Sequence, residues 1–271
     1  MDVFRLERPT SGERPVLVEV PHAGLGIPPP VAEEIVASHH AAMRDADLFV
    51  DRLYADAPSR GAVLLSARLS RFVVDLNRAP DDLEPSDSPE STRGRLAQPR
   101  GVVWRVATDG HPLLKQPLTE DQVAHRIAAY HAPYHAALRG EIARLRAAHG
   151  TVRVVAAHSM PSTARPFAKD PGPRRADVVP GTRGRTSAEA RVIDLVDAHF
   201  RDAGLSVRHD EPYKGGYTTQ HYGRPHEGVH VVQIELNRAL YMDEGTCQPI
   251  ESSFASLRAL LAGLVLKLGE L

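Results

Sequence analysis

Short apolar runs rich in β-branched residues recur along the chain and alternate with longer segments of helical periodicity. The strand-like runs cover residues 15–20, 62–67, 71–76, 152–157, 205–209 and 229–236. Most of these runs are apolar at nearly every position, whereas a strand with one wet face would alternate apolar and polar residues. The pattern therefore predicts strands that are buried on both faces, as in a parallel sheet.

Helix signals separate these runs. Apolar residues at helical spacing predict helices from Thr119 to Gly150, from Thr186 to Gly204 and over 252–268. The first two begin with a capping-box pattern, Thr119 with Gln122 and Thr186 with Glu189. Pro133 is expected to kink the first helix. The alternation of strands and helices predicts an α/β fold with a mostly parallel mixed sheet and helices on both of its faces.

The composition is that of a globular protein. The 271 residues are 42% hydrophobic and 25% charged, which is enough for a large core, and no obvious linker divides 1–271 into two domains. Lys and Arg (33) nearly balance Asp and Glu (34), and neither sign forms a long block. This balance argues against a nucleic-acid or membrane-surface partner.

Cysteine usage and the first residues indicate a compartment. The single cysteine, Cys247, cannot form an internal disulfide, and the first ten residues lack the apolar stretch of a secretory signal. The apolar run at 259–266 is too short to span a bilayer. We therefore expect a cytoplasmic protein.

Three stretches interrupt the alternation of strands and helices. Residues 79–117, 161–185 and 210–227 are rich in Pro, Gly, Arg and Asp, and the first is longer than a simple connection requires. Long loops in a compact α/β domain often form the rim of an active site. For residues 84–95, a flexible insertion is an equally good interpretation.

The tetrapeptide LeuAsnArgAla occurs twice, ending at Ala79 and at Ala239, and each copy directly follows a carboxylate, Asp75 or Glu235. Both copies close an apolar run. An acid, an amide and a guanidinium are thereby delivered to the rim of the predicted sheet, where they can bind an anionic substrate or transfer protons. Ordinary surface polarity at a strand end is the alternative.

Two of the fourteen histidines directly follow predicted buried strands: His22 comes after PVLVEVP and His158 after VRVVAA. Ligands of open α/β sheets bind at this carboxyl edge, and imidazole nitrogens suit Zn²⁺. No carboxylate lies one turn after either histidine. The candidates for a third ligand are Asp45 and Asp47, at the predicted start of a helix, where they could equally cap free amides.

Several motifs together resemble the N-formylglutamate amidohydrolase family, a group of zinc-dependent deformylases of histidine degradation. They are PHAG at Pro21, DxD at Asp45, RLY at Arg52, SRFVVDLNR at Ser70, PYHAAL at Pro133, AHS at Ala157 and KGGYTTQHYGRPHEGVHVVQIEL at Lys214. The motifs occur in the family's order over most of the chain. The resemblance implies a fold similar to that of zinc carboxypeptidases and aspartoacylase, a phosphorylase/hydrolase-like zinc-exopeptidase fold.

The resemblance also implies a metal site. His22, Asp45 and His158 are the expected ligands of one Zn²⁺, with Asp45 preferred over Asp47 because the family's pattern at this position matches the first acid of the pair. Glu235 is the expected general base. The family often has an acid before the AHS histidine, whereas this chain has Ala157, which cannot orient the histidine in the same way.

Substrate-binding roles follow from the same resemblance. Arg71 is a candidate for stabilising the charge that develops on the oxygen of the amide. Asn77 and Arg78 are expected to bind a substrate carboxylate, because a guanidinium pairs with a carboxylate in a bidentate fork. A second clamp is expected from the loop that carries Lys214, Tyr217 and Arg224.

The substrate implied by the resemblance is the small molecule N-formyl-L-glutamate. One alternative is a zinc hydrolase of another N-acyl or N-formyl amino acid or of a small peptide. Another is a metal-poor binding protein that has kept the fold and lost catalysis. The sequence does not predict the oligomeric state.

Overall fold

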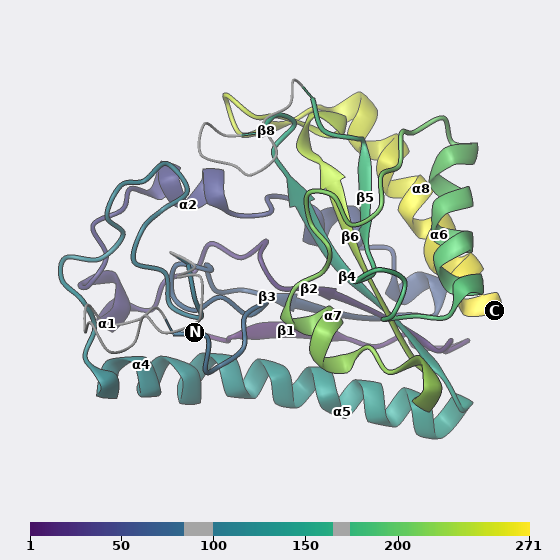
Figure 1. The fold of residues 1–271 in the computed structure, drawn as a ribbon, viewed down its shortest axis with the longest axis horizontal. Helices are drawn as coiled ribbons and strands as arrows, with labels where there is room; N and C mark the ends of the chain where they lie inside the picture. The colour runs from purple at the N-terminus through teal and green to yellow at the C-terminus, as the bar shows by residue number, and fades with distance from the viewer. Residues whose placement is uncertain (84–99, 165–173) are drawn as a thin grey trace.

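The protein folds around a mixed sheet of six strands. The computed structural model describes residues 1–83, 100–164 and 174–271. The strands are β1 (Phe4–Glu7), β2 (Val16–Val20), β3 (Val63–Ala67), β4 (Val152–Met160), β5 (Val178–Gly181) and β6 (Val229–Asn237). Their order is β1-β3-β2-β4-β6-β5, in which the inner four are parallel and the two edge strands are antiparallel to their neighbours (Figure 1). The prediction of a mostly parallel mixed sheet is confirmed.

Four of the six predicted strands are the inner strands of this sheet, but the run at 71–76 is not a strand. It forms buried turns instead, although its apolar side chains are in the core. Arg126 supplies hydrogen bonds that a neighbouring strand would have given: its guanidinium donates to the carbonyls of Phe72 and Val73 at 3.3 and 3.0 Å. Because burial is the same in both cases, the apolar pattern alone could not distinguish these turns from a strand.

The predicted strand at 205–209 is also wrong. Within it, Val207 makes only an isolated bridge to Val178. The apolar pattern did not predict the two edge strands, β1 and β5. They have four residues each, and β1 is only partly buried, so neither leaves a long apolar run in the sequence.

The helices are α1 (Pro29–Ala32), α2 (His39–Asp45), α3 (Val50–Leu53), α4 (Glu120–Arg126), α5 (Ala132–His149), α6 (Ala190–Asp202), α7 (Tyr217–Tyr222) and α8 (Glu251–Glu270). The capping box of Thr119 and Gln122 is confirmed, as is the end of α5 at Gly150, whose φ is 73°. A π-helical turn at Ile127–His131 joins α4 to α5, so the distortion expected from Pro133 lies in the preceding turn and the helix continues (Figure 1).

The second predicted capping box is wrong. The hydroxyl of Thr186 donates to the carbonyl of Arg183 instead of capping a helix. Helix α6 begins four residues later, at Ala190, and Glu189 precedes it without a side-chain cap. Gly204 follows the helix at φ 79°, as expected.

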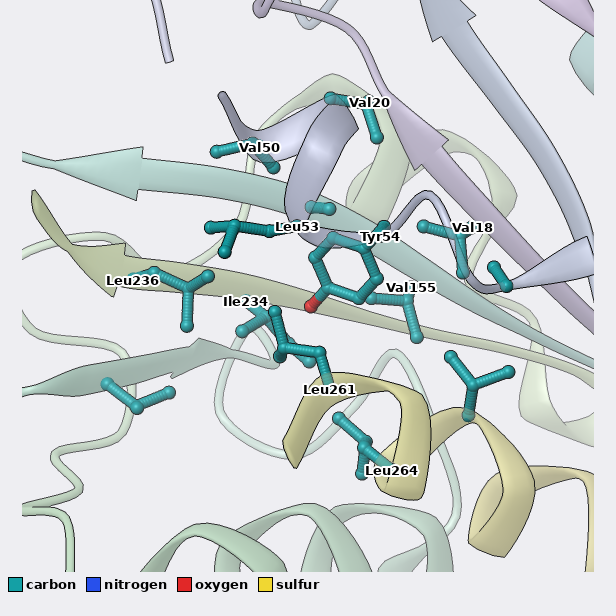
Figure 2. Packing of buried hydrophobic residues seen from close by; sticks show 14 of the residues in the cluster. Val18, Val20, Val50, Leu53, Tyr54, Val155, Ile234, Leu236, Leu261 and Leu264 are labelled. Atoms are coloured by element: carbon teal, nitrogen blue, oxygen red, sulfur yellow. The ribbon is translucent and has the colours of Figure 1, made fainter. Parts of the chain in front are cut away.

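Helices cover both faces of the sheet, as predicted. Helix α5 packs on β2, β3 and β4 from one side, and α7 packs on β6. On the other side, α3 and α8 pack against the central strands and α6 packs on β5 (Figure 1). Figure 2 shows this second layer, in which Leu53 and Tyr54 and the α8 residues Leu261 and Leu264 meet Ile234 of β6.

The apolar run at 259–266, which lies in α8, was expected to be too short to cross a membrane. The helix has 20 residues, and an 18-residue window within it has a mean hydropathy of 1.3, so it is long and apolar enough by length and composition. Its apolar character has a structural reason, because Leu257, Leu261, Leu264, Val265 and Leu268 are buried in the core.

A small antiparallel pair, β7 (Met242–Asp243) and β8 (Gln248–Pro249), follows the main sheet. The main sheet places the carboxyl ends of β2, β4 and β6 side by side, because these strands are consecutive and parallel. The chemically distinctive side chains of the sequence gather at this edge.

Candidate active site

Two histidines meet at the carboxyl ends of β2 and β4. His22 lies two residues after β2 and His158 lies in the last part of β4, and their ring centroids are 4.9 Å apart. Both are buried, with 2% and 3% of their surfaces exposed. The parallel pairing of the two strands explains how residues 136 positions apart in sequence come together.

Asp47 is the carboxylate that the fold brings to these histidines. Its Oδ2 lies 3.0 Å from Nδ1 of His158 and 3.5 Å from Nδ1 of His22. Asp45 lies elsewhere: its carboxylate accepts hydrogen bonds from the backbone N–H and the hydroxyl of Thr108. Asp45 ends α2 and does not begin a helix, so the expected capping position is wrong.

The three side chains fit a metal ion. Among the residues that the structure describes, one group of histidine and acidic side chains is close enough to hold a metal ion. It consists of His22, Asp47 and His158, which are all buried. Nε2 of His22 donates to Oδ1 of Asp75 at 2.7 Å, which leaves Nδ1 with its lone pair. This Nδ1 is buried and has no hydrogen-bond partner among the described residues. Two nitrogens and one carboxylate oxygen form a donor set that suits Zn²⁺.

Asp75 is more than a strand-end residue. Its Oδ2 accepts from Arg71 at 2.7 Å and from Nε1 of Trp104 at 2.9 Å, while Oδ1 binds His22. Burial alone would raise the pKa of this carboxyl, but the charge of Arg71 and the hydrogen bond from His22 hold the pKa well below its usual range. A permanently ionised Asp75 fixes the ring of His22, as carboxylates do behind metal-binding imidazoles.

Glu235 is positioned by the sheet itself. It is the register partner of His158 in the parallel β4–β6 pair. Gln233, two residues earlier and therefore on the same face of β6, donates to Oε1 of Glu235 at 2.8 Å. Burial, with 6% of the residue exposed, raises the pKa of Glu235 to about 7. A carboxyl with this pKa can both accept and donate a proton near neutral pH.

Asn77 is held inside the site. Its Nδ2 lies 3.1 Å from Nε2 of His158, and its Oδ1 accepts from the backbone N–H of Thr218 at 3.0 Å. The backbone of Gly216 passes so close that a Cβ there would lie 2.4 Å from Nδ2. Asn77 therefore contacts the ring of His158. Ala157 makes no such contact, because its side chain faces the hydrophobic core.

The two arginines of the first motif differ in position. Arg71 stacks on Trp104, with Cζ 4.3 Å from the ring centroid, and its buried Nε has no partner among the described residues. Its positive charge lowers the pKa of Glu235 against the larger effect of burial. Arg78 lies at the rim, with 31% of its side chain exposed, and its NH1 is 3.4 Å from Asp82.

The expected second clamp is only partly at this edge. Tyr217 donates its backbone N–H to the carbonyl of Asn77, and its ring stacks on His221. Lys214 is exposed on the adjoining loop. Arg224 is paired through its backbone with Val229, the first residue of β6. Val229 and Glu235 are six positions apart along the strand, about 20 Å, so the fold does not bring Arg224 to the site.

Residues of two of the three long stretches reach this region. Trp104 from the first contacts Asp75, and the backbone of Tyr217 from the third is bonded to Asn77. Residues 84–95, whose flexibility was left open, lie outside the described residues.

Sequence reasoning missed Gln233, Ser159 and the contacts of Arg238. Gln233 had a signal in the two-residue period of β6, which puts it on the face of Glu235. The other two contact Asp47, and they could be found only from the fold, because their partner is more than 100 residues away.

Two histidines, an aspartate and a glutamate at the carboxyl ends of parallel strands are typical of metal-dependent hydrolases with an α/β fold. A family model described as N-formylglutamate amidohydrolase matches residues 14–242. The chain therefore belongs to the N-formylglutamate amidohydrolase family, and the resemblance found in its motifs is confirmed.

Individual relatives agree with this assignment. The chain is 34% identical to an N-formylglutamate deformylase of Pseudomonas aeruginosa, over 94% of each protein. It is 32% identical to an N-formylglutamate deformylase of Pseudomonas putida, over 86% of this chain and 84% of that one. A crystal structure of N-formylglutamate amidohydrolase from Ralstonia eutropha JMP134 has a TM-score of 0.89 at 33% identity, covering 100% of this chain and 98% of the other.

Proposed function

We propose that the protein is a zinc-dependent amidohydrolase that converts N-formyl-L-glutamate and water to L-glutamate and formate, a reaction of histidine degradation. The observation that carries the proposal is the position of Glu235, directly opposite His158, which forms a buried cluster with His22 and Asp47. The two deformylase relatives support the choice of substrate.

His22, Asp47 and His158 would hold the metal. The proposal takes Asp47 in place of Asp45, because the carboxylate of Asp45 is occupied by Thr108. A bound Zn²⁺ would supply a Lewis acid that polarises the formyl carbonyl and lowers the pKa of a water molecule to about 7.

Glu235 carries the proton in this scheme. Its carboxylate accepts a proton from the attacking water as the new C–O bond forms at the formyl carbon. It then donates this proton to the amide nitrogen as the C–N bond breaks, since an unprotonated amine anion is a poor leaving group. Burial raises the pKa of Glu235 to about 7, which suits both steps.

Arginines would stabilise the negative charges of the substrate and of the reacting oxygen. Arg71 has a buried, unpartnered Nε among the described residues, and it would donate toward the oxygen that becomes negative during attack. Arg78 at the rim would bind a substrate carboxylate. Lys214 and Tyr217 on the neighbouring loop are the remaining candidates for the second carboxylate.

A substrate panel tests the proposal. Purified protein loaded with zinc would be assayed for formate and free amine with N-formyl-L-glutamate, N-formyl-L-methionine and N-acetyl-L-glutamate. We expect formate and glutamate in equal amounts from the first, at the highest kcat/KM, and loss of turnover with a chelator. Faster release of amine from N-acetyl-L-glutamate would contradict the assigned substrate, and no hydrolysis of any compound would contradict the assigned reaction.

A further inference from the structure

We infer that Arg238, together with Ser159, is a positioning residue that turns Asp47 so that one of its oxygens faces the two histidines. The inference rests on the proposed function, because it concerns the side chain proposed as the third metal ligand. Arg238 belongs to the second LeuAsnArgAla copy, whose guanidinium the sequence placed at the rim of the sheet, whereas the structure buries it.

Arg238 is buried, with 6% of its surface exposed, and its guanidinium is surrounded by acceptors. NH2 donates to Oδ1 of Asp47 at 3.2 Å and to the carbonyl of Ala46 at 2.7 Å. NH1 donates to the carbonyl of Arg44 at 2.7 Å, and Nε donates to Oγ of Ser159 at 3.1 Å. The planar fork of an arginine fixes all four partners at once, which a lysine could not do. Arg238 therefore holds the link between α2 and α3 against the end of β6.

The two oxygens of Asp47 are divided between two sets of partners. Oδ1 is the oxygen that Arg238 binds, and the hydroxyl of Ser159 lies 3.4 Å from it. Oδ2 is the oxygen that lies near the two histidines. A carboxylate without the first set could rotate and present either oxygen, or neither, to the histidines. The guanidinium removes this freedom and also offsets the buried negative charge.

A similar division occurs on the other side of the cluster. Asp75 gives Oδ1 to His22 and Oδ2 to Arg71. Each aspartate is thus shared between a histidine of the cluster and an arginine. Arg71 and Arg238 come from different segments, and each lies close to one copy of the repeated motif.

Among the described residues, Arg238 donates its side-chain hydrogen bonds to Asp47, to Ser159 and to two backbone carbonyls, and none to Glu235 or to either histidine. Its charge also lowers the pKa of Glu235 against the larger effect of burial. Its direct contact with the proposed metal ligands is therefore the bond to Asp47. A change at Arg238 should alter metal affinity and kcat while leaving KM nearly unchanged.

The test is the zinc affinity of the full-length metal-free protein, measured by competition with a chromophoric chelator, without any substrate. Removal of groups that orient metal ligands typically weakens binding about 10–100-fold, and we expect this loss in Arg238→Met. Arg238→Lys should recover part of it. Arg258→Met is the matched control, because Arg258 also pairs with an aspartate, Asp56, but on α8 away from the cluster. Its zinc affinity should stay within about twofold of wild type.

Ser159→Ala covers the case in which Arg238→Met does not fold. It removes one partner of Oδ1 without leaving a buried charge unpaired, and it should weaken zinc binding severalfold. Wild-type zinc affinity in folded Arg238→Met, or in both Arg238→Lys and Ser159→Ala, would overturn the inference and leave the proposed function intact. A wild-type chain that binds no zinc would instead contradict the proposed function itself.

Discussion

His158 and Glu235 are register partners across the parallel strands β4 and β6. Side chains at partnered positions of neighbouring strands lie on the same face, with backbones about 4.8 Å apart. The central hydrogen-bonded pair of the sheet therefore fixes the distance between a proposed metal ligand and the proposed base. Because both strands are buried along their whole length, neither residue can shift without disturbing the core.

The neighbouring acids Asp45 and Asp47 give a matched pair of substitutions. Asp47→Asn should weaken zinc binding by a factor of about 100 or more, because the anionic ligand beside the two histidines is lost. Asp45→Asn should keep zinc affinity within about threefold and lower the free energy of unfolding by about 1 kcal/mol, through its bonds to Thr108. Chelator competition and urea unfolding measure the two effects. Equal losses of affinity in both variants would show that Asp47 has no special role.

Gly216→Ala should damage the support of His158. The added Cβ would lie 2.4 Å from Nδ2 of Asn77, so Asn77 must move away from the imidazole that it contacts. We expect kcat for formate release to fall at least about tenfold, in line with the loss of groups that orient metal ligands. Gly140→Ala is the control. A Cβ added at Gly140 on α5 would have nothing within 4 Å, and the free energy of unfolding should rise by about 1 kcal/mol because alanine favours the helix. Wild-type kcat in Gly216→Ala would contradict the contact.

Substitutions of Arg78 and Arg224 distinguish substrate binding at the rim of the site from an effect of surface charge in general. Arg78→Met should raise KM for N-formyl-L-glutamate about tenfold or more, as expected for the loss of a charge-assisted pair, with a smaller change in kcat. Arg224→Met removes the same charge at the amino end of β6 and should change neither constant. Steady-state kinetics of the two variants side by side are sufficient. A larger effect on KM from Arg224→Met would mean that the substrate binds elsewhere.

Buried neutral histidines should make the fold sensitive to acid. Burial lowers the pKa of His135 from 6.5 to about 3. The unfolded chain therefore takes up a proton at this residue before the folded chain does. The stability from neutral His135 is complete above pH 6.5 and is lost as the pH falls from about 6.5 to about 3, on the order of 5 kcal/mol in all.

Urea unfolding between pH 7.5 and 4, with a chelator present to exclude metal effects, measures this dependence. His135→Asn should be less stable at pH 7.5, because the bonds to Leu76 and Tyr222 are altered, and should lose less stability on acidification. Parallel curves for the variant and the wild type would contradict the assignment.

The fold was largely predictable because burial leaves a clear pattern in sequence. The runs that became β2, β3, β4 and β6 are apolar enough to identify, and Thr119 with Gln122 identifies the start of α4. Residues 71–76 show the limit of this approach. Their burial equals that of a strand, but distant Arg126 satisfies their carbonyls, and no local pattern contains that information.

The positions of candidate site residues were predictable where a place in a strand determines them. His22, His158 and Glu235 lie together, as expected, because parallel strands end at one edge. The choice between Asp45 and Asp47 depends on the end of α2, where Asp45 turns toward Thr108 and Asp47 toward the histidines. Arg224 lies within a motif that resembles the family and is close to Glu235 in sequence. The two residues are nevertheless far apart in space, because most of β6 runs between them.

The central claim is that Glu235 carries the proton while other side chains hold the metal. Glu235→Gln keeps the shape of the side chain and removes its ability to accept a proton. The most direct test is kcat for formate release from N-formyl-L-glutamate by this variant, with bound zinc quantified in the same sample. We predict one zinc per chain, as in wild type, and a kcat reduced about 10²–10⁴-fold. Wild-type turnover in the zinc-loaded variant would contradict the account.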